Sequence, residues 1–324
     1  GFELVHSYQW EGSQDDAAAL EFLDAAWKNG LRVFIGFDRG NHSGQGLVQG
    51  NDAHVVRRVA ALAGHPGLFC WYLFDEPEVP GQYVSARTLT RFADTIRTLD
   101  PYHPVVVTTW GSRMNSYRRS WDTHWSQSYS RPAQVVQTLQ EHRKLLLNAS
   151  PITFLAHCYD QKQSAVLRAG GTVAPAAFEP DAPWMRAAAF AGVTQRANGL
   201  IWWWYADGTK DYYTVARVPA AWQALCGVVA QVRELRPVLV ADGSPECATV
   251  AVADGAIEVW SKRVQGERTV IAVHTGEQDV TAAIPMPGTG AVRVLFEDRE
   301  VMRQGGALQD AFGRYGVHIY RGAE

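Results

Sequence analysis

Residues 67–78 read GLFCWYLFDEPE, and this stretch decides the fold of the chain. Seven consecutive apolar or aromatic residues between Gly67 and Asp75 predict a strand buried on both faces, as strands of a parallel sheet are. Pro77 ends this strand, and two acids, Asp75 and Glu76, stand at its carboxyl end. In a βα barrel the carboxyl ends of the strands form the floor of the active site. Both acids are therefore candidates for chemistry rather than for packing.

Strands and helices alternate on both sides of this stretch. We expect the other strands at 2–9, 31–37, 104–109, 121–129, 151–158 and 199–205, and helices at 15–27, 53–63, 85–99, 133–147, 184–197 and 219–235. This alternation predicts an α/β fold, and over about 235 residues the economical closure is a TIM (β/α)8-type barrel. The eighth strand is either 172–178 or a strand upstream of Gly1, and in the second case the barrel lacks its first strand. The chain opens directly on a predicted strand without an initiator Met, which indicates a processed product or a fragment.

The pattern changes past residue 236. Short strands separated by Gly, Asp and Pro turns are expected at 247–252, 256–261, 269–274, 279–284, 291–296 and 316–320. This spacing is typical of a small antiparallel β-sandwich. The sequence therefore predicts a barrel domain over 1–236 and an all-β sandwich accessory domain over 237–324.

The composition is that of a globular protein with a substantial core, because 47% of the residues are hydrophobic and 19% are charged. A net charge of −3 gives no electrostatic footprint for nucleic acid or an anionic membrane, and no apolar run approaches the ~20 residues of a membrane span. We therefore expect neither as a partner. The four cysteines lie far apart without a C-x-x-C pair, so neither a disulfide framework nor a zinc site is indicated. They fit a cytoplasmic protein as well as a secreted one.

Aromatic and polar side chains gather near the predicted strand ends. The flat faces of Trp and Tyr stack on the C–H faces of sugar rings, and the chain has 12 tryptophans. Glycoside hydrolysis also needs two carboxyl groups across a cleft, one as proton donor and one as nucleophile or base. The residues that we expect to bind a carbohydrate substrate are Trp10, Glu11, Asp38, Asp75, Trp110, Trp125, Gln127, Tyr129, His157, Trp204 and Tyr205.

Three segments together resemble the barrel glycoside hydrolases of the large retaining superfamily called clan GH-A. They are GLRV at 30–33, WYLFDEP at 71–77 and NGLIWWW at 198–204. The closing segment 315–320 is similar to the accessory β-domains that such enzymes carry. The resemblance spans the whole chain and implies a glycosidase with a two-carboxylate, retaining mechanism, but it does not name a substrate.

The resemblance assigns the role of general acid/base to Glu76. In that clan the acid/base Glu ends the fourth strand and usually follows an Asn that binds the sugar 2-hydroxyl. Here Asp75 stands in place of the Asn. If Glu76 ends the fourth strand, the strand at 2–9 is the second and the chain lacks its first strand.

The second catalytic carboxyl departs from the clan's pattern. The nucleophile of the clan is a Glu at the end of the seventh strand, whereas the strand at 151–158 is followed by Tyr159 and Asp160. We rank Glu179 slightly above Asp160 as the nucleophile, and Glu11 third. The two carboxyl groups lie about 5–5.5 Å apart in retaining enzymes and about 6.5–9.5 Å apart in inverting ones.

Two rival interpretations stay open. The first is a carbohydrate-binding barrel that has lost catalysis, or an N-terminally truncated fragment of an enzyme. The second is a metal-dependent barrel hydrolase, although no H-x-H or H-E-x-x-H spacing occurs. Its candidate ligands are His6, Asp38, Asp75, His124 and His157. The Gly-rich segment 44–50 has one residue too many for a dinucleotide loop, so we expect no cofactor.

Overall fold

The computed structural model describes residues 1–7, 15–37, 52–79, 83–109, 111–173, 178–205 and 211–323, with only the backbone of Ser112. The chain forms two compact units. The first, called the N-terminal unit below, comprises Phe2–Gln127 and Glu141–Thr153. The second, called the C-terminal unit, comprises Gly1, Ser128–Gln140 and Phe154–Glu324.

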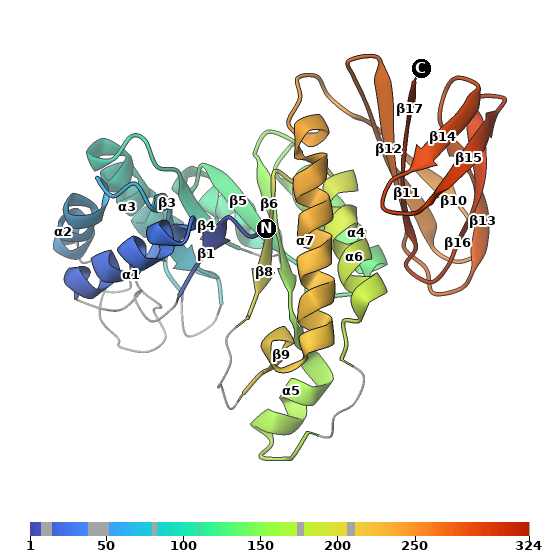
Figure 1. The fold of residues 1–324 in the computed structure, drawn as a ribbon. Helices are drawn as coiled ribbons and strands as arrows, with labels where there is room; N and C mark the ends of the chain where they lie inside the picture. Colours follow the sequence, from blue (N-terminus) through green and yellow to red (C-terminus); the bar gives the residue numbers. More distant parts are fainter. Residues whose placement is uncertain are drawn as a thin grey trace. The chain divides into compact units, whose positions relative to one another are not determined.

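Seven strands form one parallel sheet in the order β1-β2-β3-β4-β5-β6-β8 (Figure 1). They are β1 (Leu4–Val5), β2 (Arg32–Gly36), β3 (Leu68–Asp75), β4 (Val105–Thr108), β5 (Thr123–Gln127), β6 (Ile152–His157) and β8 (Gly199–Trp203). Each strand pairs with the next one along the sheet in chain order, which confirms the expected TIM-type barrel fold. Of the expected strand at 172–178, residues 172, 173 and 178 are described, and none of them is in a strand.

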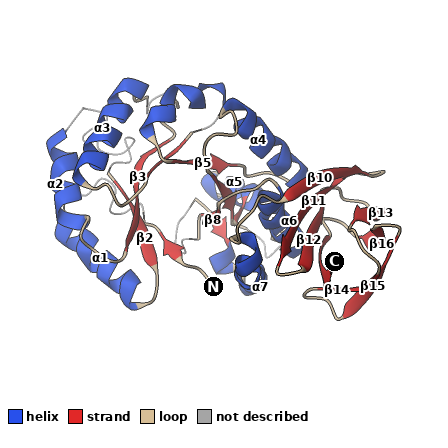
Figure 2. Cartoon of the chain, turned by 90° about the horizontal axis from the view of Figure 1, so that it is seen from above, coloured by secondary structure: helices blue, strands red, loops and turns tan. Residues whose placement is uncertain are grey.

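Helices connect these strands. They are α1 (Asp16–Lys28), α2 (Asp52–Leu62), α3 (Ala86–Leu99), α4 (Pro132–Leu145), α5 (Gln161–Arg168), α6 (Ala182–Thr194) and α7 (Pro219–Leu239), with 3-10 helices η3 (Gly111–Ser120) and η4 (Val215–Arg217). In the N-terminal unit, α1, α2 and α3 lie on the outer side of β2 and β3 (Figure 2). Within the described residues, each helix is too short or too polar to span a lipid bilayer.

Helix α3 illustrates how the sequence forms this outer layer. Its buried residues Leu89, Phe92, Ala93 and Ile96 recur at helical spacing and give the helix one apolar face. Ser85 caps the amino end by accepting a hydrogen bond from the backbone N–H of the residue three positions on. The helix therefore begins where the capping residue stands and packs through a single stripe.

Strand β3 is buried over most of the predicted run, although Phe69 is 38% exposed. Its residues from Cys70 to Phe74 are at most 4% exposed. Trp71 Nε1 donates a hydrogen bond of 2.8 Å to Asp100 Oδ2, which fixes the strand to the end of α3. The pairing of β3 with β4 shifts register between Tyr72 and Phe74. Such a bulge changes which face the following side chains take.

The C-terminal region is one antiparallel sheet in the order β10-β11-β12-β17-β14-β15-β16-β13, and this sheet nearly closes on itself. Its strands are β10 (Glu246–Ala251), β11 (Ala256–Val264), β12 (Glu267–His274), β13 (Val280–Pro285), β14 (Gly290–Val294), β15 (Arg299–Gln304), β16 (Ala307–Phe312) and β17 (Val317–Ala323). This confirms the expected all-β domain, with one curled sheet in place of two packed ones. Helix α7 runs on to Leu239, and the domain boundary at residue 236 stays a prediction.

Two of these strands, β15 and β16, are not predicted by the sequence analysis. Leu308 and Phe312 point into the core of the domain, whereas the residues between them are largely polar. Gly305 and Gly306 join the two strands with φ of 62° and 81°. Positive φ at both turn residues is the geometry of a two-residue type I′ hairpin, which glycine adopts readily.

Candidate active site

The two acids that the sequence singles out lie together at the carboxyl end of β3. Asp75 is the last residue of the strand, and Glu76 follows it with a φ of 53°. This left-handed conformation is uncommon for a residue with a side chain. It is held by two backbone hydrogen bonds, from Glu76 N–H to Thr108 O at 2.9 Å and from Val79 N–H to Glu76 O at 3.1 Å. Backbone strain that the surrounding structure maintains is typical of functional sites.

The Glu76 side chain is partly buried and accepts a hydrogen bond from the side-chain amide of Gln127, the last residue of β5. Burial raises the pKa of Glu76, the negative charge of Asp75 raises it further, and the Gln127 hydrogen bond opposes them. The net direction is upward. A carboxyl group with a raised pKa retains its proton nearer neutral pH, which suits it to donate that proton as a general acid.

Asp75 accepts a hydrogen bond from the Tyr72 hydroxyl, which in turn contacts the Thr108 hydroxyl. Tyr72 donates a hydrogen bond of 2.8 Å from its hydroxyl to Asp75 Oδ1. The same hydroxyl lies 2.7 Å from Thr108 Oγ1, and because the Tyr72 proton goes to Asp75, Thr108 is the donor there. Neither Tyr72 nor Thr108 is among the sequence-predicted site residues. A polar residue at the end of the neighbouring strand is the signal that would have indicated Thr108.

An aromatic cluster of the N-terminal unit packs around Tyr72. Trp125 of β5 stacks on Tyr72 with ring centroids 5.1 Å apart, and Phe34 of β2 meets Trp125 edge-on at 4.7 Å. His6 stacks on Phe34 at 4.2 Å and has its Nδ1 within hydrogen-bond distance of Phe34 O. Trp125 is only 3% exposed, so in this structure it supports Tyr72. Its contact with substrate stays a prediction.

Two of the three candidates for the second carboxyl, Asp160 and Glu179, belong to the C-terminal unit and differ in environment. Asp160 caps α5: its Oδ1 accepts from Gln163 N–H, and its Oδ2 accepts from Glu179 N–H, both at 2.9 Å. It is 2% exposed. Glu179 Oε2 accepts from Lys162 Nζ at 2.5 Å, and its side chain is 29% exposed. Asp160 therefore has both carboxylate oxygens occupied by backbone N–H groups, whereas Glu179 has an accessible carboxylate.

A second aromatic cluster lies at the carboxyl ends of β6 and β8 in the C-terminal unit. Tyr129 stacks on Trp203 at 5.4 Å, and His157 meets Tyr129 edge-on at 5.7 Å. Burial lowers the pKa of His157 to about 4, so this imidazole is neutral at neutral pH. Trp204 follows β8 with a φ of 126° and packs 5.0 Å from Trp203. Tyr205 is 53% exposed.

Four of the predicted site residues lie outside the described residues: Trp10, Glu11, Asp38 and Trp110. Of the candidate metal ligands, His124 is buried beside His142, with ring centroids 5.6 Å apart. Burial lowers the pKa of His124 to about 3 and that of His142 to about 4. In the part of the chain that is described, no three His, Cys, Asp or Glu side chains converge to hold a metal ion.

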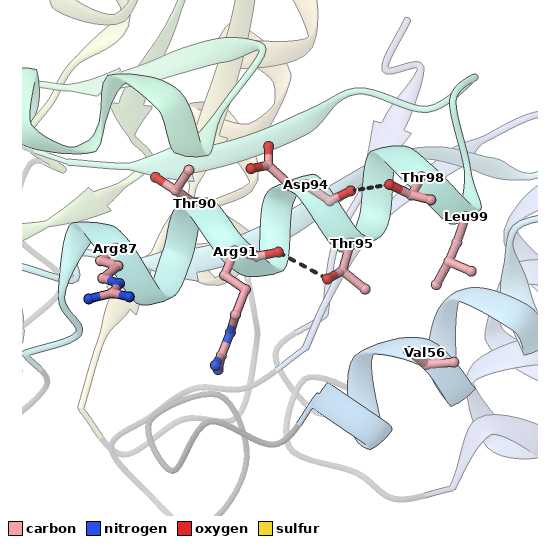
Figure 3. Close-up of a pocket in the computed structure, with 8 residues that line it drawn as sticks. All are labelled: Val56, Arg87, Thr90, Arg91, Asp94, Thr95, Thr98 and Leu99. Atoms are coloured by element: carbon pink, nitrogen blue, oxygen red, sulfur yellow. Dashed lines mark hydrogen bonds between the residues drawn. The ribbon is translucent and has the colours of Figure 1, made fainter.

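A shallow groove of about 520 Å³ is lined by residues of α3 and by Val56 of α2 (Figure 3). The hydroxyls of Thr95 and Thr98 in this groove donate to backbone carbonyls of α3 itself, at 3.0 and 2.8 Å. Arg91 forms an ion pair of 3.2 Å with Asp52. The groove therefore presents side chains whose hydrogen bonds are made within the helix layer, and none of the residues around Glu76 lines it.

Comparison with solved structures finds the same fold in carbohydrate-active enzymes. An α-amylase from Geobacillus thermoleovorans, solved with acarbose, matches with a TM-score of 0.62 and 11% identity over 98% of this chain and 83% of that one. A GH30 endoxylanase from Clostridium papyrosolvens C71 matches with a TM-score of 0.53 and 12% identity over 100% and 90%. An acarbose-soaked debranching enzyme from Nostoc punctiforme matches with a TM-score of 0.54 and 13% identity over 98% and 83%.

These similarities define the class of fold. The chain has the fold of barrel glycoside hydrolases that carry an antiparallel β-domain, as the sequence resemblance implies. No protein-family model matches the sequence, and no curated protein matches it. At 11–13% identity the structural likeness shows the fold alone.

Proposed function

We propose that this protein is a glycoside hydrolase and that Glu76 is its general acid/base. The observation that carries the proposal is the partly buried Glu76 carboxyl at the carboxyl end of β3, with Asp75 beside it raising its pKa. Proton donors of glycosidases are carboxylic acids whose pKa is raised by their environment. The fold shared with enzymes described as amylase, endoxylanase and debranching enzyme supports an oligo- or polysaccharide as substrate.

In the proposed mechanism Glu76 donates its proton to the glycosidic oxygen as the bond from that oxygen to the anomeric carbon breaks. The carboxylate of Glu179 attacks the anomeric carbon and forms a glycosyl ester. Glu76, now ionised, then takes a proton from a water molecule whose oxygen displaces Glu179. Retention of configuration requires the two carboxyl groups to lie about 5–5.5 Å apart, and this separation is a prediction for Glu76 and Glu179.

The accessible carboxylate of Glu179 supports its choice over Asp160. A nucleophile must reach its substrate, and Asp160 is 2% exposed, with its two carboxylate oxygens capping α5 and holding the backbone of residue 179. Lys162 forms an ion pair with Glu179 Oε2. Asp160 is then a structural neighbour of the nucleophile.

Activity of Glu76→Gln tests the proposal. Starch, xylan and aryl glycosides are suitable substrates, and Glu21→Gln, which changes an exposed glutamate of α1, is the matched control. Loss of a general acid lowers turnover by about 10²–10⁴-fold, whereas the control should keep full activity. Azide should restore turnover of an aryl glycoside with a good leaving group, because azide attacks the glycosyl ester without a general base. Unchanged turnover in Glu76→Gln on any substrate that the protein hydrolyses would remove Glu76 from the mechanism.

A carbohydrate-binding barrel without catalysis is the second candidate. The observation that favours it is the Lys162–Glu179 ion pair, which engages one oxygen of the more accessible second carboxyl. Calorimetric titration with the oligosaccharides of the same panel separates the two functions. Binding without hydrolysis, unaltered by Glu76→Gln and Glu179→Gln, supports the binding protein and contradicts the enzyme.

A further inference from the structure

The carboxylate of Asp181 joins α6 to the β-domain, which is the antiparallel sheet of strands β10 to β17 with its turns. Its Oδ1 accepts a hydrogen bond of 3.1 Å from Trp184 N–H and so caps the amino end of α6. Its Oδ2 accepts one of 2.5 Å from Arg314, which lies in the turn between β16 and β17. Because Asp181 stands two residues after Glu179, this ion pair fixes the chain close to the proposed nucleophile.

A second contact between the same two parts of the C-terminal unit reinforces the first. Glu277, which follows β12, forms an ion pair with Arg131 and accepts a hydrogen bond of 2.9 Å from the Tyr315 hydroxyl. Trp184 Nε1 donates to Ser130 O at 3.1 Å, and its ring lies 6.0 Å from that of Tyr315. The β-domain thus contacts both the segment after β5 and the start of α6.

The residues before Asp181 are held from the opposite side by α5. Glu179 N–H donates to Asp160 Oδ2 at 2.9 Å, and the Glu179 carboxylate accepts from Lys162 at 2.5 Å. The short segment 178–181 is therefore fixed at one end by α5 and at the other by Arg314.

Solvent exposure indicates what this contact does. The Arg314 and Asp181 side chains are 37% and 42% exposed, and exposed ion pairs contribute little to global stability. Tyr315, by contrast, is 1% exposed, and its N–H donates a hydrogen bond of 3.0 Å to Gly276 O, which anchors the turn to the segment after β12. A rigid turn that presents a weak ion pair orients the segment that it contacts more than it stabilises the fold.

We propose that the β-domain is a positioning element of the active site, in which Arg314, with Glu277 and Tyr315, fixes the direction of the segment that carries Glu179. The part of this inference that concerns catalysis rests on the proposed function. The part that concerns order does not, because it predicts a local change in backbone protection that needs no substrate.

Hydrogen–deuterium exchange of the full chain tests the inference. Arg314→Ala and Asp181→Asn both remove the ion pair, and Asn keeps the helix cap because it is as good an N-cap as Asp. Amides of residues 178–184 should exchange up to about fivefold faster in each variant. The double variant should not exceed the single ones, since the two residues share one interaction. Arg314→Lys, which keeps the charge, and Arg293→Ala, an exposed arginine of β14, should behave like wild type.

Kinetics of the same variants completes the test. Arg314→Ala should lower kcat with little change in KM, because it misdirects the nucleophile and leaves substrate contacts in place. Unchanged exchange at 178–184 overturns the positioning role. So does faster exchange with full activity in Arg314→Ala while Glu179→Gln is inactive. Faster exchange in a protein whose Glu76→Gln and Glu179→Gln variants retain full activity overturns the proposed function and leaves the ordering role standing.

Discussion

Tyr72 and Asp75 lie three residues apart in one strand, yet the Tyr72 hydroxyl donates a hydrogen bond of 2.8 Å to Asp75 Oδ1. Regular alternation would place side chains three apart on opposite faces of a sheet. The register shift between Tyr72 and Phe74 inserts one residue and returns Asp75 to the face of Tyr72. The bulge therefore assembles the polar cluster beside Glu76.

Removal of the Tyr72 hydroxyl should loosen this cluster. We expect Tyr72→Phe to lower the free energy of unfolding by about 1 kcal/mol or more, because a buried hydroxyl with two hydrogen-bond partners is lost. Urea denaturation measures the effect. Tyr102→Phe is the control, since Tyr102 is 88% exposed and its change should be neutral. Equal stability of the two variants would contradict a role for the bulge in fixing Asp75.

Asp75 and Gln127 should shift the pH dependence of activity in opposite directions. As the general acid of the proposed mechanism, Glu76 would act in its protonated form, so activity should be lost as pH rises through its pKa. Asp75→Asn removes a charge that raises this pKa, and the alkaline limb should move to lower pH. Gln127→Ala removes a hydrogen bond that lowers it, and the limb should move to higher pH. Profiles of kcat/KM against pH for both variants make the comparison.

The left-handed backbone at Glu76 should make glycine the more stable of two truncations. Glycine normally costs stability relative to alanine, but at a φ of 53° alanine retains the steric strain. We expect Glu76→Gly to be more stable than Glu76→Ala by about 1 kcal/mol, with both variants inactive. Thermal unfolding of the pair measures this difference. A more stable alanine variant would show that residue 76 adopts an ordinary conformation.

Buried histidines should make the fold sensitive to acid. Burial lowers the pKa of His142 to about 4, from the value of 6.5 for the free side chain. Below pH 6.5 the unfolded chain therefore binds a proton that the folded chain excludes, and stability falls until pH reaches about 4. We expect His142→Gln to remove about 3 kcal/mol of this pH dependence. Urea midpoints of both proteins between pH 7 and pH 4 provide the measurement, and parallel curves would contradict the neutral buried state.

The sequence predicts the barrel strands well because strands buried on both faces form continuous apolar runs, and β3 is the clearest of them. It also predicts that Glu76 stands at the carboxyl end of a strand, because proline follows the two acids directly. It does not predict the position of Tyr72 in the site, because a bulge leaves no local signal. Strand β15 is missed because charged residues interrupt its alternation, although the Gly305-Gly306 pair signals the turn that follows it.

The environment of the candidate second carboxyl groups could be predicted in part from the sequence. Asp160 is followed three positions later by Gln163, a spacing typical of a helix amino terminus, and this would have favoured a capping role over catalysis. The pairing of Glu179 with Lys162 could not be predicted from the sequence, because it depends on how residues 178–181 pack against α5. Such a contact is set by tertiary packing and leaves no pattern in the sequence.

The ion pair between Asp181 and Arg314 joins residues that are 133 positions apart. A ribosome adds residues in order, at about 5–20 per second, so the partner of Asp181 emerges many seconds after α6 does. Until then the start of α6 lacks its anchor in the β-domain, even if the helix itself has formed. If Arg314 positions Glu179, the barrel gains its full competence for catalysis only after the turn between β16 and β17 has been synthesised.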